Sequence, residues 1–403
     1  MTIGAGGSNA AAELEKIENR TYDVQPILLE EYLGRIKKAV QLMKDHSVKV
    51  LYLNAGTNLY YFTGTLWSAS ERMVGVLLFD DGSLEYIVPK FEDGTFKKYK
   101  KVNSSINCWE EHESPYVLFG NLLNTKNILT GLIAIDESAP YFLVDGVSKA
   151  NSSYDFITAQ NITSACRMQK SKNEIAIIQK AKDITMEVQR AAARILRPGI
   201  TVGEVTDFIN KAHIKAGISS GSYFCIVLFG DDTQYPHGVS VPQPLKENEA
   251  VIVDTGCRLE GYLSDITRSY VYGEASDEYR TIWNLEKKTQ LAAFEAAKIG
   301  ASCGSVDDAA RKTLAEAGLS PDYNLPGLPH RVGHGTGLDI HEYPYLVRGS
   351  EIKLLEGMVV SNEPMICIPG KFGIRHEDHF YMTENGAKWF TEPMFIVDNP
   401  FGY

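Results

Sequence analysis

The segment AVIVDTGCRLEGYLSDITRSYVYG, residues 250–273, has the layout of a β-hairpin that carries two acidic side chains. A β-branched run leads to Asp254, turn residues follow, and the second half alternates apolar and polar side chains. With the turn centred near 259–260, Asp254 is expected opposite Asp265, where cross-strand Cβ atoms lie roughly 5 Å apart. Two carboxylates at that separation repel each other unless a cation lies between them. The hairpin therefore predicts a cation site.

The segment MVVSNEPMICIPGKFGIRHEDHFYMT, residues 358–383, repeats this layout. Its centre at Gly370 sets Glu363 opposite Glu377 by the same symmetry. Four converging carboxylates supply the oxygen ligands that bridge two divalent metals about 3.5–4 Å apart. In the alternative interpretation the acids lie on the solvated faces of ordinary hairpins. This would have to be true of both acid pairs, which makes it less favoured than it would be for one pair.

Between the hairpins, PHRVGHGTGLDIHEY at 329–343 holds three of the nine histidines. Its glycines permit sharp turns and close approach of a ligand. His334, between two glycines, is predicted to be the single nitrogen ligand. His330 and His341 are expected nearby as hydrogen-bond donors to the substrate or to a tetrahedral intermediate. A phosphate-binding loop would also explain the glycines, but the Lys-Ser/Thr pair of a P-loop does not follow them.

The rest of the chain predicts two domains with mixed helices and strands. In the N-terminal part a helix is expected at 31–46 and strands at 49–56, 74–79, 85–89 and 131–135. From about residue 165 a helix–glycine–helix layout occurs twice, at 169–196 with 202–217 and at 278–300 with 306–318, which indicates an internal duplication. The expected fold class is α/β (α+β), with a disordered lead-in at 1–25, an N-terminal α/β domain at 26–163 and a catalytic domain at 164–403.

Composition limits the partners and the compartment. The net charge of -11 argues against a nucleic-acid partner, because phosphate binding needs a basic surface. The six cysteines are scattered and predict reduced thiols. No stretch approaches the ~20 apolar residues of a membrane span, and the polar start does not resemble a secretory signal. A cytoplasmic protein that does not bind a membrane is therefore expected.

Several motifs now resemble those of the pita-bread metallopeptidases, which include methionine aminopeptidase, aminopeptidase P, prolidase and the metal-free creatinase. The matching stretches are PHG at 236–238, VDTG at 253–256, SDITRSY at 264–270, HRVGHGTGLDIHE at 330–342, SNEP at 361–364 and GIRHEDH at 373–379. The resemblance implies a creatinase-like N-terminal domain followed by a pseudo-twofold pita-bread catalytic domain. It also implies the metal ligands Asp254, Asp265, His334, Glu363 and Glu377. The implied substrate-handling residues are His237, His330, His341 and Arg375.

The resemblance further implies a metal-dependent exopeptidase that cleaves before proline in Xaa-Pro dipeptides or short peptides. Two divalent ions, manganese first and cobalt or zinc otherwise, would hold a bridging hydroxide, with Glu363 as proton shuttle. A homodimer is expected. One alternative is an Xaa-Pro aminopeptidase that acts on longer peptides, and another is creatinase-like or dimethylsulfoniopropionate lyase-like chemistry. A third is a binding module without enzymatic activity, but such relatives typically lose metal ligands and this chain keeps all five. Arg375 either binds a substrate carboxylate or orients a ligand acid. His376 and His379 depart from the family pattern.

Overall fold

The structure, a computed structural model, describes residues 2–403 and divides into two compact units. One unit spans Ile27–Arg167, and the other combines the segment before it with Met168–Tyr403. The boundary lies slightly beyond the expected 163/164, because helix α7 (Gln160–Arg167) stays with the first unit. Each unit is therefore described by itself.

The unit Ile27–Arg167 is built on one six-stranded mixed sheet with the order β4-β3-β2-β1-β5-β6. Its elements are α2 (Leu29–Asp45), β1 (Val48–Asn54), α3 (Thr57–Thr63), β2 (Gly75–Phe79), β3 (Leu84–Pro89), α4 (Asp93–Tyr99), β4 (Ser105–Trp109), α5 (Pro115–Thr125), β5 (Gly131–Ile135), α6 (Tyr141–Ala150), β6 (Tyr154–Thr158) and α7. The expected helix and the four expected strands are confirmed. The two outer strands, β4 and β6, were not expected.

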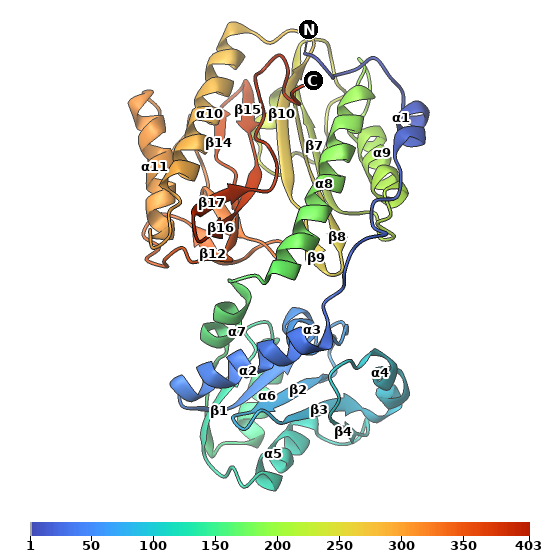
Figure 1. Cartoon of the computed structure of the whole chain (residues 1–403), viewed down its shortest axis with the longest axis vertical. Coiled ribbons are helices and arrows are strands. Elements are labelled where there is room, and N and C mark those ends of the chain that lie inside the picture. The colour runs from blue at the N-terminus through green and yellow to red at the C-terminus, as the bar shows by residue number, and fades with distance from the viewer. Residues whose placement is uncertain (1) are drawn as a thin grey trace. The chain divides into compact units, whose positions relative to one another are not determined.

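The larger unit contains two similar halves, each with a pair of helices and antiparallel strands (Figure 1). The first half comprises α8 (Lys172–Arg194), α9 (Val202–Lys215), β7 (Ser222–Phe229), β8 (Glu249–Leu259), β9 (Tyr262–Leu263) and β10 (Ile266–Tyr272). The second comprises α10 (Asp277–Ala296), α11 (Cys303–Glu316), β11 (Gly333–Gly335), β12 (Glu342–Leu346), β13 (Val359–Asn362), β14 (Met365–Ile368), β15 (Phe372–Arg375), β16 (Asp378–Thr383) and β17 (Gly386–Trp389). The predicted duplication and the expected helices agree with this layout.

The four long helices of this unit begin in the same way. Each has a Ser or Thr N-cap whose hydroxyl accepts a hydrogen bond from a backbone N–H of the first turn, which satisfies a donor that the helix itself leaves unpaired. These N-caps are Ser171, Thr201, Ser276 and Ser302. In Figure 1, α8 and α9 (green) lie against the β7–β8–β10 sheet. In the second half α10 packs on β13, β14 and β15, and α11 on β12.

The register of the first hairpin differs from the prediction. Asp254 pairs with Thr267 across β8 and β10, so it does not lie opposite Asp265. The reason is the turn, in which Glu260 (φ 48°) and Gly261 (φ 88°) both adopt positive φ and form a tight two-residue connection. This turn is centred one residue later than expected, so each residue of β8 pairs with a residue of β10 two positions further along the chain than predicted. Because side chains alternate along a strand, Asp265 still lies on the same face as Asp254, as a diagonal neighbour.

The register of the second hairpin is confirmed. The β14–β15 ladder places Met365 opposite Arg375 about a turn at Gly370, and the β13–β16 ladder continues in the same register. Glu363 and Glu377 lie between these two ladders and are therefore opposite each other.

The ladder opens at these two glutamates, and their backbone amides bond elsewhere. The N–H of Glu363 donates to the carbonyl oxygen of Val332 at 2.8 Å, and the N–H of Glu377 donates to that of Thr267 at 3.2 Å. Each glutamate is thereby tied to another segment of the site: one to the histidine segment, the other to the first hairpin.

The expected disordered lead-in at 1–25 is not found; of this range only Met1 lies outside the described residues. Helix α1 (Ala10–Lys16) is capped by Asn9 and packs on α8 and α9. Its Glu13 is buried and pairs with Arg194 at 2.6 Å. The segment is ordered by these tertiary contacts, which its polar and small residues do not reveal in the sequence alone.

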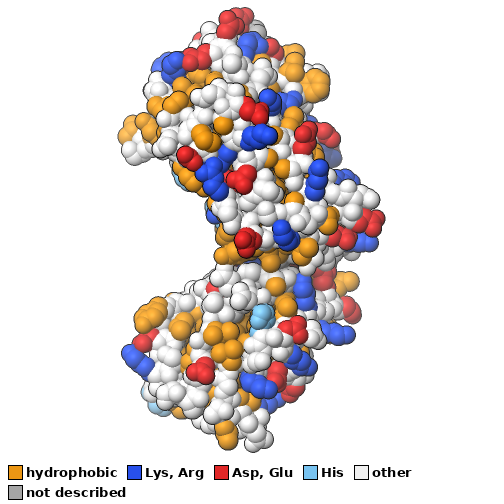
Figure 2. Space-filling view, turned by 90° about the vertical axis from the view of Figure 1, so that its left-hand side faces the viewer, with side chains coloured by type: hydrophobic (Ala, Val, Ile, Leu, Met, Phe, Trp, Pro, Cys, Tyr) orange, Lys and Arg blue, Asp and Glu red, His pale blue; other side chains and the backbone are white. Residues whose placement is uncertain are grey.

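The surface has a mixed character. On the face shown in Figure 2, basic and acidic side chains are interspersed with apolar ones. None of the helices that the structure describes combines the length and the apolar character that a membrane span requires.

Candidate metal centre

The predicted ligands of the two hairpins and the histidine segment come together in the interior. One ligand atom each from Asp265, His334 and Glu377 lies within 4.8 Å of the others, and all three side chains are buried. Nε2 of His334 is 2.9 Å from Oε1 of Glu363 and 3.7 Å from Oδ2 of Asp265. Four predicted ligands thus surround one small volume.

Asp254 is the fifth predicted ligand, and its two carboxylate oxygens have different surroundings. Its Oδ2 accepts a hydrogen bond from Nη2 of Arg375 at 2.6 Å. Its Oδ1 is buried and has no hydrogen-bond partner among the described residues. A buried carboxylate oxygen without a donor is costly unless a cation binds it. The cluster therefore fits a cation beside Asp254.

The two ring nitrogens of His334 have different surroundings. Its Nδ1 lies 3.0 Å from the carbonyl oxygen of Gly335, and because a carbonyl only accepts, Nδ1 carries the hydrogen. Nε2, the other ring nitrogen, faces Oε1 of Glu363 and Oδ2 of Asp265. A carbonyl that holds the second ring nitrogen in this way is the usual support for a metal-binding histidine.

The electrostatics of the cluster also call for positive charge. Burial raises the pKa of Asp265 well above its usual value, and the neighbouring Glu377, Asp254 and Glu363 raise it further. Burial, together with Glu363 and Asp254, raises the pKa of Glu377 in the same way. Buried acids that crowd one another are stabilised in their charged form by divalent cations, and an oxygen-rich set with one imidazole suits such ions. The residues present fit the metals that the motifs imply.

Several other residues contact the predicted ligands, and among them only His379 had been singled out from the sequence, as a departure from the family pattern. Thr267 donates its hydroxyl hydrogen to Oε2 of Glu377 at 2.6 Å, and Nε2 of His379 lies 3.2 Å from Oε1 of the same carboxylate. Nζ of the fully buried Lys182 donates to the carbonyl oxygen of Asp265 at 3.0 Å. For Thr267 a signal existed, since it follows Asp265 by two positions on one strand face.

His376 lies outside the cluster, as strand alternation predicts. Its ring centroid is 4.5 Å from that of Trp283, and its Nε2 lies 3.2 Å from Oε2 of Glu286 on α10. His376 therefore belongs to the packing behind the site.

A cavity of about 480 Å³ opens onto the cluster. It is lined by Pro236, His237, Tyr323, Pro329, His330, Arg331, His334, His341, Val347, Glu363 and Arg375. The predicted substrate-handling histidines His237, His330 and His341 all face this cavity. Among the four acids of the cluster, Glu363 is the one that lines it.

The hydrogen bonding of His330 differs from the expected donor role. Its Nδ1 lies 2.7 Å from the carbonyl oxygen of Arg331, so this nitrogen carries the hydrogen. Burial lowers the pKa of His330, which keeps the ring neutral. Its buried Nε2 has no partner among the described residues and is an acceptor in this state.

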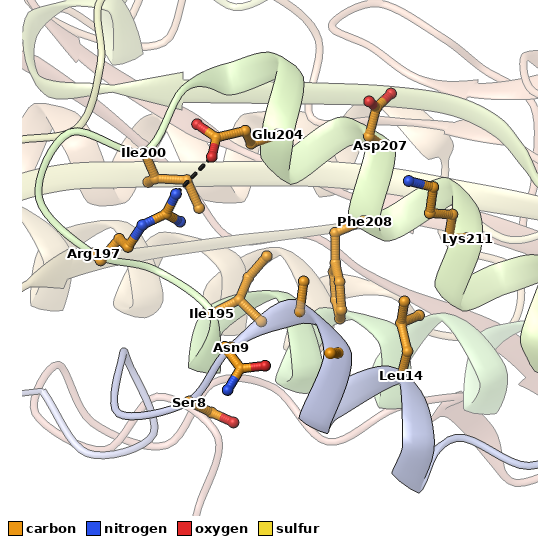
Figure 3. Close-up of a pocket in the computed structure, with 12 residues that line it drawn as sticks. Ser8, Asn9, Leu14, Ile195, Arg197, Ile200, Glu204, Asp207, Phe208 and Lys211 are labelled. Atoms are coloured by element: carbon orange, nitrogen blue, oxygen red, sulfur yellow. Dashed lines mark hydrogen bonds and ion pairs between the residues drawn. The ribbon is translucent and has the colours of Figure 1, made fainter.

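A second hollow, of about 460 Å³, lies beside α1 and α9, far along the chain from the ligands (Figure 3). Leu14, Ile195 and Phe208 contribute apolar surface, and Arg197 pairs with Glu204 at 2.6 Å. Its lining contains neither histidine nor any predicted ligand, so it is separate from the candidate metal centre.

A pseudo-twofold domain with helix pairs, hairpins and a buried acid–histidine cluster defines a metallopeptidase of the pita-bread fold. Comparison with known families agrees: residues 176–384 match metallopeptidase family M24, and residues 35–169 match the creatinase/prolidase N-terminal domain. The chain belongs to this metallopeptidase family.

Individual relatives span nearly the whole chain. The Xaa-Pro dipeptidase of Pyrococcus furiosus is 31% identical over 360 residues, which cover 89% of this chain and 97% of that protein. The crystal structure of dipeptidase PepE from Mycobacterium ulcerans matches with a TM-score of 0.85 at 29% identity and covers 93% of this chain and 99% of that one. X-Pro aminopeptidase from Thermotoga maritima matches with a TM-score of 0.76 at 25% identity and covers 90% and 99%.

Proposed function

We propose that this metallopeptidase is a Xaa-Pro dipeptidase that uses two divalent cations, manganese before cobalt or zinc. The observation that carries the proposal is the cluster of four carboxylates and one imidazole, of which Glu363 and His334 line a cavity with further histidines. The 31% identity to a Xaa-Pro dipeptidase supports the substrate class.

The metals would be held by Asp254, Asp265, His334, Glu363 and Glu377. When bound, divalent cations in such a site act as Lewis acids that polarise a carbonyl and acidify water. The unpartnered Oδ1 of Asp254 and Nε2 of His334, which faces two of the acids, are the two atoms whose surroundings most favour this assignment.

The proton transfers are assigned to Glu363. Its Oε1 lies within reach of His334 and accepts a hydrogen bond from the Ser361 hydroxyl at 3.1 Å, while its side chain also lines the cavity. A carboxylate in contact with both the cluster and the substrate space can accept a proton and return it to the leaving nitrogen.

The cavity histidines orient the substrate. His237 and His341 are placed to donate hydrogen bonds to the carbonyl oxygen and its developing negative charge. The ring of His341 lies 4.2 Å from that of His334, centroid to centroid, next to the reacting carbonyl in this proposal. His330, as an acceptor, suits an N–H of the substrate.

Arg375 is assigned to the metal centre. Its Nη2 bonds Asp254, its Nε donates to Thr267 at 3.1 Å, and its Nη1 donates to the carbonyl oxygen of Pro236 at 3.3 Å. All three nitrogens are engaged, and the residue is 3% exposed. These contacts favour an orienting role over substrate binding.

The test is activity after removal of metal and readdition of manganese, cobalt or zinc. We expect the chelated protein to be inactive and the reloaded protein to cleave Gly-Pro and Ala-Pro faster than Gly-Leu and Ala-Pro-Gly. Faster cleavage of the tripeptide would favour the aminopeptidase alternative, and no cleavage of any peptide with any metal would contradict the proposal.

Light scattering tests the proposed homodimer, whose mass would be twice 44.7 kDa.

A further inference from the structure

Two arginines line the active-site cavity, and they differ in how their donors are used. The guanidinium of Arg375 is buried and bonded to Asp254, Thr267 and a backbone carbonyl. No hydrogen bond or ion pair holds the guanidinium of Arg331 within the part of the chain that the structure describes. Arg331 therefore retains a full set of donors at the cavity wall.

The strand register and one aromatic ring fix the place of Arg331. In the β11–β12 ladder, the ligand His334 lies opposite Tyr345. The guanidinium carbon of Arg331 lies 4.2 Å from the centre of the Tyr345 ring. A cation stacked on an aromatic face is held in position while its N–H groups stay available at the edge of the plane. Arg331 is thus anchored beside the metal centre and is not a freely moving surface side chain.

A dipeptide brings a carboxylate one residue away from the bond that is cut. The proposed metals already offset the four acids, so a substrate carboxylate that leaves water for this cavity needs a cationic partner of its own. A guanidinium binds a carboxylate through two parallel N–H···O hydrogen bonds. We propose that Arg331 binds the C-terminal carboxylate of the substrate and thereby selects dipeptides over longer chains. This inference rests on the proposed peptidase function and adds the residue that determines substrate length.

The experiment compares substrates that differ only at the carboxylate. Arg331→Met and Arg331→Lys are assayed with metal-loaded enzyme on Gly-Pro, Gly-Leu and the C-terminal amide of each. Arg190→Met is the matched control, because Arg190 is exposed on α8 in the same unit and outside the cavity. We expect Arg331→Met to raise KM for the free acids by roughly 10–100-fold and to leave the amides nearly unchanged. Arg331→Lys should recover part of the loss.

Binding is measured separately from turnover. Calorimetry follows a non-cleavable Gly-Pro isostere, in which a methylene replaces the scissile carbonyl, as free acid and as amide. Weaker binding of the acid alone to Arg331→Met supports the assignment, even if Gly-Pro itself is not hydrolysed and the proposed proline specificity fails. Equal losses for acid and amide, or no loss for either, would overturn the role of Arg331 whether or not the peptidase function holds.

Discussion

The hydroxyl of Thr267 donates to Oε2 of Glu377 at 2.6 Å and so joins the strand of one hairpin to a ligand of the other. The same hydroxyl oxygen accepts a hydrogen bond from Nε of Arg375 at 3.1 Å. The Thr267 hydroxyl thus connects Arg375 to Glu377 through two hydrogen bonds, although Thr267 is not itself a predicted ligand.

Replacement of Thr267 by valine removes this connection and keeps the shape of the side chain. We expect Thr267→Val to bind metal roughly 10–100-fold more weakly, because Glu377 loses the donor that orients it. Metal titration followed by elemental analysis measures the affinity, and Thr267→Ser, which keeps the hydroxyl, is the control. Wild-type affinity in the valine variant would show that the hydrogen bond does not support the site.

The histidines should separate into two groups by metal content. We expect His334→Ala to lose one of the two proposed metals and nearly all activity, because its Nε2 faces the acids directly. His237→Ala and His341→Ala should retain their metal and lose turnover by roughly 10²–10³-fold. Elemental analysis of the three purified variants decides the matter, and a metal-free His341→Ala protein would contradict this division.

Arg375→Lys should reduce the cleavage of Gly-Pro and of Gly-Pro amide by the same factor. Lysine cannot reproduce the three separate contacts of the guanidinium, so Asp254 loses its orientation with either substrate. Measurement of kcat and KM on the pair gives the answer. A loss confined to the free acid would mean that Arg375, and not Arg331, receives the substrate carboxylate.

The buried His213 on α9 predicts a pH dependence of stability. Burial lowers its pKa from 6.5 to about 4, with Thr185 and Ser222 hydroxyls on its two ring nitrogens. Between these values the unfolded chain binds more protons, so stability is lost as the pH falls from about 6.5 to about 4. The shift corresponds to about 3 kcal/mol.

His213→Gln removes the titrating group and keeps hydrogen-bonding capacity. Urea unfolding at pH 7 and pH 4.5, with chelator present in both proteins, should show a smaller pH-dependent loss of stability in the variant than in wild type. An identical loss in both would rule out His213 as a source of the acid sensitivity.

The sequence predicted the central strands of the first unit and missed its outer ones for a physical reason. Strand β2 is buried along its whole length and reads as the continuous apolar run GVLLF. The outer strands β4 and β6 are largely exposed or half-buried, so their side chains show little apolar periodicity. Their place in the sheet comes from pairing with β3 and β5, which only the folded chain supplies.

The ligand acids could be predicted because hairpin symmetry is a local property. In the first hairpin the predicted pairing was wrong by two residues. A shift of two residues keeps Asp265 on the same strand face as Asp254, whereas a shift of one residue would have placed it on the opposite face. Lys182 could not be found in this way. It lies on a helix rich in lysines, and only the packing of α8 against the sheet buries its ammonium group beside Asp265.

The candidate metal centre lies between the two halves, with the predicted ligands Asp254 and Asp265 from the first and His334, Glu363 and Glu377 from the second. Neither half alone holds a complete ligand set, and the Glu377 amide bonds the Thr267 carbonyl of the other half. The partly exposed connection at 274–276, between β10 and α10, is therefore a natural place to split the polypeptide. Co-expressed fragments should bind metal only when they reassociate. Metal binding, and the activity that depends on it, would then report that two proteins fused to the fragments have come together.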